Sequence, residues 1–237
     1  MEDKALLSTE VASGAEKAEL LIVIPAYNEA ENIERVVNHL TANFPQYDYV
    51  VVNDGSRDET AAICQRNGYN LLNLPVNLGL AGAFQAGYQY AVQLDGDGQH
   101  RPEYLESMIK KMEEGYDIVI GSRFVGEKKP FTMRMLGSNL IEMAIRFTTG
   151  VNIKDPTSGM RMFSKRMIRE FASGLNYGPE PDTVSYLIRQ GARVAEVPVI
   201  MDERILGVSY LTPVNAMRYM LKMLISILLI QNFRKRR

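Results

Sequence analysis

The stretch Val92-Gln93-Leu94-Asp95-Gly96-Asp97-Gly98-Gln99-His100 joins a short apolar run to a turn that contains two carboxylates and two glycines. In extended backbone, residues i and i+2 point to the same side, so Asp95 and Asp97 can converge on one ion. Such oxygen ligands suit Mg²⁺ or Mn²⁺, which keeps several waters and accepts phosphate oxygens from a substrate. A solvated Asp-Gly turn is the alternative interpretation, because the pattern is short and common.

Three short apolar segments before this stretch are predicted strands, over residues 20–24, 49–53 and 70–74. The first is a run of Leu, Ile and Val, as in a strand buried on both faces. Strands that alternate with helical patterns in this way pair in parallel and form a doubly wound α/β sheet. Ligands of such sheets bind at the carboxyl ends of the strands, where Asp54, Asn77 and Asp95 all lie.

Helix starts are expected after each of these strands. Asn28 is placed to cap the first helix, and Ser56-Arg57-Asp58-Glu59 matches a capping box for the second. Asn77-Leu78-Gly79 is expected to open the third. Further along, apolar spacing predicts helices over about 102–112, 136–147 and 182–189, and strands over 117–120, 160–163 and 194–199.

The composition is that of one globular domain with a basic end. The chain has 237 residues, 46% of them hydrophobic, and the net charge of −1 divides into +6 for residues 213–237 and −7 for the rest. This balance argues against nucleic-acid binding through overall charge. Cys64 is the only cysteine, so no internal disulfide forms. We expect no signal peptide in the first 19 residues, and therefore a cytoplasmic protein.

Six motifs follow one another along the chain. They are Ile24-Pro25-Ala26-Tyr27-Asn28-Glu29, Val52-Asn53-Asp54-Gly55-Ser56, Asn77-Leu78-Gly79, Leu94 to His100, Gly121-Ser122-Arg123, and Glu203-Arg204 with Gly207 and Ser209. In this order and spacing the chain resembles glycosyltransferase family 2, in the branch of dolichyl- and polyprenyl-phosphate sugar synthases. The resemblance implies a GT-A fold for residues 19–212, after a leader at 1–18. It also implies an inverting, metal-dependent hexosyltransferase that uses a nucleotide-sugar donor.

The resemblance gives each motif a role. The residues implied to bind the nucleotide-sugar are Pro25, Tyr27, Glu29, Asp54, Asn77, Gly79, Asp95 and Arg123. Asp95, Asp97 and Gln99 are implied to ligate Mg²⁺ or Mn²⁺, and Arg204 to neutralise the departing nucleoside diphosphate. Two alternatives stay open: Arg123 in a structural salt bridge, and Asn28 with Glu29 as a helix cap.

The preferred acceptor is a polyprenyl phosphate, for synthesis of a cell-surface glycan such as a cell-wall polysaccharide. A hydroxyl of a lipid-linked or polysaccharide glycan is the alternative, and Glu180 or Asp182 would then act as general base. Otherwise this pair only decorates a helix N-terminus. Asp155 and Ser158-Gly159 belong to a loop that the family places near the acceptor, and we expect His100 to support the metal turn.

Two departures from the family pattern favour other functions. The segment between Gly79 and Asp95 is short, which is compatible with a non-catalytic partner subunit that binds sugar nucleotides. Tyr210 stands where lipid-phosphate sugar synthases often have Lys, which weakens the case for a lipid-phosphate acceptor.

Residues 213–237 predict a basic amphipathic helix. Asn215, Arg218, Lys222 and Ser226 form a polar stripe beside a broad apolar face, and four cations follow at 234–237. This pattern is typical of a helix that lies on an anionic membrane surface, here the inner face of the cell membrane. The helix around 136–147, with Arg134 and Arg146, could add to the same surface. Packing on the domain or in a homo-oligomer is the alternative.

Overall fold

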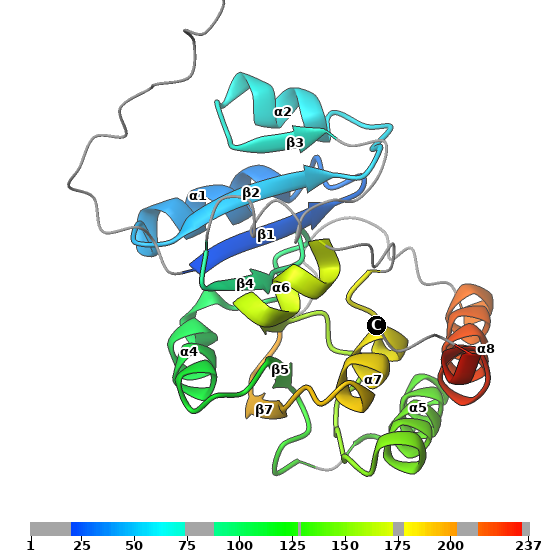
Figure 1. Cartoon of the computed structure of the whole chain (residues 1–237). Coiled ribbons are helices and arrows are strands. Elements are labelled where there is room, and N and C mark those ends of the chain that lie inside the picture. The colour runs from blue at the N-terminus through cyan, green and yellow to red at the C-terminus, as the bar shows by residue number, and fades with distance from the viewer. Residues whose placement is uncertain (1–19, 74–87, 128, 173–177, 203–212, 234–237) are drawn as a thin grey trace, which may run out of the picture.

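The protein forms one mixed sheet with helices on both faces, as the computed structural model in Figure 1 shows. The structure describes residues 20–73, 88–127, 129–172, 178–202 and 213–233. The strands are β1 (Leu20–Ala26), β2 (Asp48–Asn53), β3 (Leu71–Asn73), β4 (Tyr90–Gln93), β5 (Ile118–Ser122), β6 (Arg161–Ser164) and β7 (Val194–Pro198). Their order in the sheet is β3-β2-β1-β4-β6-β5-β7.

The strands that carry the motifs run in the same direction. β1 pairs in parallel with β2 and β4, whereas β6 is antiparallel to both β4 and β5. Two antiparallel steps restore the direction, so β5 is also parallel to β1. The carboxyl ends of β1, β2, β4 and β5 therefore meet at one edge of the sheet, where doubly wound folds bind their ligands. This arrangement confirms the predicted mostly parallel α/β fold.

Two layers of helices cover the sheet. The helices are α1 (Ile33–Asn43), α2 (Thr60–Arg66), α4 (Leu105–Glu113), α5 (Met133–Thr149), α6 (Lys165–Ala172), α7 (Pro181–Arg189) and α8 (Pro213–Leu228), with the 3₁₀ turns η1 (Pro102–Tyr104) and η2 (Ile230–Phe233). α1, α2 and α4 share one hydrophobic cluster with the sheet, and α5 to α8 share the other. None of the helices in the described part of the chain has both the length and the apolar character needed to span a bilayer.

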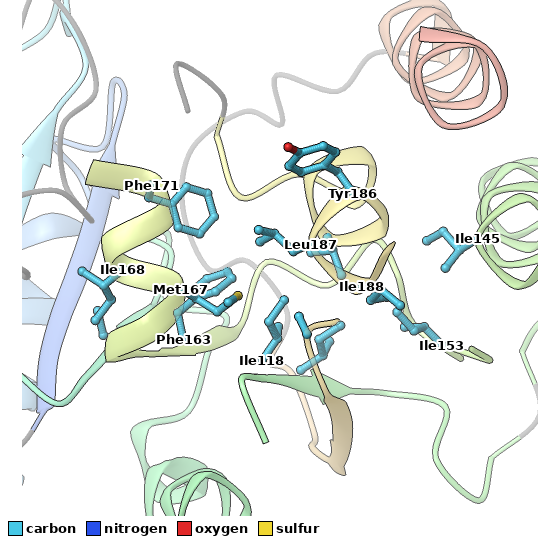
Figure 2. Close-up of a cluster of buried hydrophobic side chains, with 14 of the residues drawn as sticks. Ile118, Ile145, Ile153, Phe163, Met167, Ile168, Phe171, Tyr186, Leu187 and Ile188 are labelled. Carbon is cyan, nitrogen blue, oxygen red and sulfur yellow. The ribbon is translucent and has the colours of Figure 1, made fainter. Parts of the chain in front are cut away.

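Alternation along the strands explains the two clusters. In β1, Ile22 and Ile24 point to the side of α1, whereas Leu21 and Val23 belong to the cluster on the opposite face. Figure 2 shows the cluster that the sheet shares with α5 to α8. In it, Phe163 of β6 packs edge-on against Phe171 of α6 at a centroid distance of 5.2 Å. Strands buried on both faces account for the nearly continuous apolar run that predicted β1.

Two predicted helix caps are wrong. α1 begins at Ile33, and Asn28 lies before it with a φ of 56°. α2 begins at Thr60, so Ser56 does not cap it either. The polar side chains of the two loops bond across to the other loop instead, and such tertiary pairing competes with local capping. The predicted end of α5 at Gly150 is confirmed, because this residue adopts a φ of 76°.

Candidate functional site

The loops after β1 and β2 are joined by hydrogen bonds between side chains and backbone. The amide of Asn28 donates to Ser56 Oγ (3.0 Å), and the amide of Arg57 donates to Asn28 Oδ1 (2.8 Å). The amide of Glu29 donates to Thr60 Oγ1 at 2.9 Å. These bonds hold two loops that lie about 30 residues apart in sequence as one surface at the carboxyl edge of the sheet.

The side chains expected to hold a nucleoside differ in how far they reach this surface. Tyr27 is 43% exposed and Asp54 is also exposed, so both face solvent at the edge. Glu29 is only 8% exposed, and its Oε2 accepts a hydrogen bond from Asn32 Nδ2 at 2.8 Å. A ring wall with a few fixed polar groups is the arrangement that small-molecule sites use.

The acidic turn after β4 is held by its own backbone and by His100. Asp97 Oδ1 accepts from the amide of Gln99 at 3.0 Å, and the amide of Asp95 donates to His100 Nδ1 at 2.9 Å. The neutral imidazole therefore carries its proton on Nε2, which lies 3.6 Å from Asp95 Oδ2. His100 is buried, so it supports the turn from behind rather than facing solvent.

The segment that follows β7 contacts the acidic turn. Gln99 Nε2 donates to the carbonyl oxygen of Asp202 at 3.1 Å, and the amide of Asp202 donates to the carbonyl oxygen of Gln99 at 3.0 Å. Arg101 pairs with the Asp202 carboxylate and holds the pKa of that carboxyl below its usual value. These bonds use the amide nitrogen of Gln99 and leave its oxygen as the atom through which it can ligate an ion.

Gly159 lies against the first carboxylate of the turn. A Cβ on Gly159 would come within 2.6 Å of Asp95 Oδ2 and 3.0 Å of His100 Cε1, so no side chain fits there without moving the carboxylate. The loop that carries this glycine is fixed by Ser158 Oγ, which donates to the carbonyl oxygen of Gly121 at 2.6 Å. The sequence places this loop near the acceptor only through the family resemblance, whereas the structure brings it against Asp95.

Arg123 forms the salt bridge that the sequence left open as an alternative. Its Nε and Nη2 lie 2.7 Å and 2.8 Å from the carboxylate of Asp155, whose side chain is fully buried. The amide of Arg123 donates to the same carboxylate at 3.1 Å. The amide of Asp155 in turn donates to Glu196 of β7 at 2.8 Å. The pair ties the carboxyl end of β5 to the 155–159 loop, and a role of Arg123 toward a donor stays a prediction.

Glu180 and Asp182 are bonded to α8. Glu180 Oε2 accepts from the hydroxyl of Tyr219 at 2.5 Å, and Asp182 Oδ2 accepts from Ser226 Oγ at 2.6 Å. Asp182 Oδ1 accepts from the amide of Thr183 at 2.8 Å, so both oxygens of this nearly buried carboxylate are engaged. Burial and the neighbouring Glu180 raise the pKa of Tyr219. A role of either carboxylate as general base stays a prediction.

The prediction that Ser226 lies in the exposed polar stripe of α8 is wrong, because this side chain is buried and bonds to Asp182.

Three predicted site residues lie outside the described part of the chain. They are Asn77, Gly79 and Arg204. The residues that the sequence did not single out are Arg101 and Asp202. Their partners lie far away in sequence, at separations such as the 101 residues between Arg101 and Asp202. Only the proximity of Arg101 to the acidic turn was a signal that could have found it.

The acidic turn fits a divalent cation. Asp95 is 38% exposed at its side chain, and Asp95, Asp97 and Gln99 offer hard oxygen donors of the kind that Mg²⁺ and Mn²⁺ prefer. Within the described residues no cluster of three or more His, Cys, Asp or Glu side chains is gathered around one point. With two carboxylates and one amide oxygen as donors, a Mg²⁺ or Mn²⁺ ion would complete its shell with water and substrate phosphates.

The protein has a mostly parallel sheet with aromatic and acidic loops at its carboxyl edge, the edge at which doubly wound α/β proteins bind their ligands. Residues 21–172 match the family Glycosyl transferase family 2. The chain belongs to this family and is a glycosyltransferase.

Curated relatives and solved structures agree with this assignment. The chain is 31% identical to polyprenol monophosphomannose synthase of Mycolicibacterium smegmatis, over 85% of this chain and 84% of the relative. It is 30% identical to undecaprenyl-phosphate mannosyltransferase of Micrococcus luteus, over 80% of this chain and 86% of the relative. The fold is similar to glucosyl-3-phosphoglycerate synthase of Mycobacterium tuberculosis in complex with Mn²⁺, UDP-glucose and phosphoglyceric acid. That match has a TM-score of 0.66 and 18% identity, and it covers 90% of this chain and 79% of the other.

Proposed function

We propose that the protein is an inverting, metal-dependent glycosyltransferase that moves a sugar from a nucleotide-sugar donor to a polyprenyl phosphate, for synthesis of a cell-surface glycan. The observation that carries the proposal is the acidic turn at 95–99, which lies at the same sheet edge as the joined loops after β1 and β2. The names of the two relatives support a polyprenyl-phosphate acceptor.

At the donor side, Tyr27 and Asp54 are placed to contact the nucleoside, with Pro25 and Glu29 behind them. Pro25 contacts the acidic turn, because its carbonyl oxygen accepts from the amide of Gly96 at 3.2 Å. We propose that the nucleoside loops and the neighbouring turn at Asp95 hold opposite ends of one donor. From the sequence, Asn77, Gly79 and Arg204 join this site.

The metal ion of the proposal is Mg²⁺ or Mn²⁺, held by Asp95, Asp97 and the amide oxygen of Gln99. When bound there, it supplies positive charge for the diphosphate leaving group. The solved structures of the mycobacterial synthase with Mn²⁺ or Mg²⁺ and UDP support this choice of cation. Two hydrogen bonds fix the acidic turn: the backbone amide of Gln99 donates to Asp97, and the backbone amide of Asp95 donates to His100.

A lipid phosphate is already anionic at neutral pH and needs no general base. Asp182 agrees with this acceptor, because both of its oxygens accept hydrogen bonds from protein groups. Arg123 stands at the carboxyl end of β5, where its guanidinium pairs with Asp155. If the acceptor were a glycan hydroxyl, Glu180 would be the first candidate base.

The acceptor also sets the location. We propose a peripheral protein on the cytoplasmic face of the cell membrane, with residues 19–212 as the catalytic domain after a leader at 1–18. Residues 213–237 form the part that meets anionic lipid, because they contain six cations and no carboxylate.

The test is a donor screen with the full chain, Mn²⁺ or Mg²⁺, and polyprenyl phosphate in detergent. We expect release of nucleoside diphosphate together with a glycosylated lipid. Asp97→Asn should lower turnover by at least about 100-fold, because the variant loses an anionic metal ligand. Glu113→Gln, an exposed carboxylate of α4, is the matched control and should leave turnover unchanged. Tight nucleotide binding without turnover for any donor and acceptor would instead identify a non-catalytic binding subunit.

A further inference from the structure

An apolar stripe runs along the outer side of α5. It consists of Leu136, Leu140, Met143 and Phe147, which are 46%, 44%, 65% and 85% exposed. At about 100° per residue the four side chains fall within an arc of roughly 60°. Ile141 and Ile145 on the opposite side are fully buried in the core. The helix is thus apolar on both sides, and its packing on the sheet accounts for only one of them.

α8 repeats this arrangement. Met217, Leu221, Ile225 and Leu228 are 67%, 58%, 43% and 39% exposed, whereas Met223 and Ile227 are buried in the core. The two stripes lie on neighbouring helices, which Figure 1 shows side by side. A Cβ on Gly137 of α5 would come within 2.8 Å of Met220 Cγ of α8, so the two helices pack closely at this point.

We propose that the exposed stripes of α5 and α8 form one surface, the two-helix face, that docks on an anionic lipid leaflet and inserts its apolar side chains among the lipid chains. The inference rests on the proposed function, which requires a membrane acceptor. It adds α5 as an equal part of the contact, so that docking does not depend on the C-terminal helix alone. Apolar area and adjacent cations together are the pattern of interfacial helices.

The charges beside the two stripes fit an anionic leaflet. Arg146 of α5 and Arg218 and Lys222 of α8 are exposed. Glu142 is the one carboxylate in the sequence of either helix, and it is largely buried and paired with Lys129 at 2.7 Å and Lys154 at 3.6 Å. The face therefore presents positive charge around apolar side chains, which matches phosphate headgroups above hydrocarbon.

The same charges disfavour a second copy of the chain as the occupant. In a two-fold dimer the face would meet itself. The cations of the two helices would then approach the same cations of the partner, with Glu142 already engaged. Like charges at close range raise the free energy of such a complex.

The two-helix face is fixed to the core of the domain through α7. α8 is bonded to α7 through Tyr219 with Glu180 and through Ser226 with Asp182. The helix that contacts lipid on its outer side is therefore held on its inner side by the start of α7.

The test measures sedimentation of the full chain with vesicles, without donor or metal. One variant combines Met143→Ser with Phe147→Ser on α5, and a second combines Met217→Ser with Leu221→Ser on α8. Vesicles of phosphatidylglycerol and phosphatidylcholine should bind each variant about tenfold or more weakly than the parent chain. Ile200→Ser, which removes an apolar side chain that is 64% exposed outside both helices, should bind as the parent does.

Normal binding of the α5 variant would overturn the proposal, because α8 would then be sufficient. Unchanged vesicle binding together with loss of an oligomer in vesicle-free solution would also overturn it, in favour of a second copy. Sugar transfer in detergent is measured separately. Its absence would count against the proposed function while vesicle binding still tests the two-helix face.

Discussion

At the level of single residues, the acidic turn depends on a neighbour that has no side chain. Gly159 approaches Asp95 so closely that its replacement changes the position of a proposed ligand without touching its chemistry. The same residue also borders His100, which holds the turn from behind. A substitution here separates the geometry of the site from its charge.

We expect Gly159→Ala to weaken Mn²⁺ binding by about tenfold, because the new methyl group displaces the Asp95 carboxylate and ligand position controls affinity. Titration calorimetry with Mn²⁺ and a nucleoside diphosphate measures the effect. Gly178→Ala is the matched control, since its Cβ would meet only Glu180 Cγ at 3.8 Å, an ordinary contact. Equal affinities for the two variants would show that Asp95 is not a ligand.

The Arg123–Asp155 pair allows a second prediction at this scale. Asp155→Ala should lower the free energy of unfolding by about 3 kcal/mol, because it leaves a largely buried guanidinium and the backbone amide of Arg123 without their acceptor. Urea unfolding measures the change. Glu114→Ala removes an exposed ion pair with Lys111 and should cost less than about 1 kcal/mol. If both variants lose the same small amount, the pair contributes little to stability.

At the level of elements, local patterns predicted the strands and most helices but not the contacts between them. β1 and α5 were predictable because burial on both faces and helical spacing leave a mark within a few residues. The caps at Asn28 and Ser56 were wrongly predicted, because each side chain bonds to a loop about 30 residues away. α6 was not predicted, although Met167, Ile168 and Phe171 bury one side of it.

The amino end of β5, opposite the acidic turn, allows a prediction about how stability depends on pH. Asp117, just before β5, pairs with Arg166 of α6 and accepts from the amide of Arg193. Burial alone would raise the pKa of Asp117, but these partners outweigh burial and hold it below its usual value. The unfolded chain therefore binds this proton more readily than the folded chain. The stabilisation is complete above the unfolded pKa of about 3.9 and disappears as the pH falls through the folded pKa.

Asp117→Asn should consequently flatten the acid side of the stability profile. We expect the variant to be less stable than the parent at pH 7 and closer to it at pH 3, where the parent has lost part of the stabilisation from the charged carboxylate. Urea unfolding at a series of pH values measures this difference. A constant difference across the range would assign the effect of the substitution to packing rather than to charge.

At the level of the whole molecule, the site is assembled from loops that the sheet brings together. Sequence could place Asp54 and Asp95 at strand ends, because parallel topology follows from element order. It could not show that the 155–159 loop reaches Asp95, or that α8 belongs to the core. Both depend on the antiparallel strand β6 and on helix packing, which no local pattern encodes.

The role of α8 in the core changes what its removal tests. If α8 only contacted the membrane, deletion of residues 213–237 would release the protein from anionic membranes and leave the fold intact. In the structure Met223 and Ile227 are buried, and Ser226 bonds to Asp182. A chain that ends at 212 should therefore be less stable by at least about 3 kcal/mol, since each of these two buried apolar side chains is worth roughly 1.5–3 kcal/mol. A chain that ends at Phe233 keeps α8 and η2 but lacks the four final cations, and it should unfold at the parent's temperature. Thermal unfolding of the three chains measures the difference. Equal stability of the shortest chain and the parent would mean that α8 is a separate anchor and not part of the folded domain.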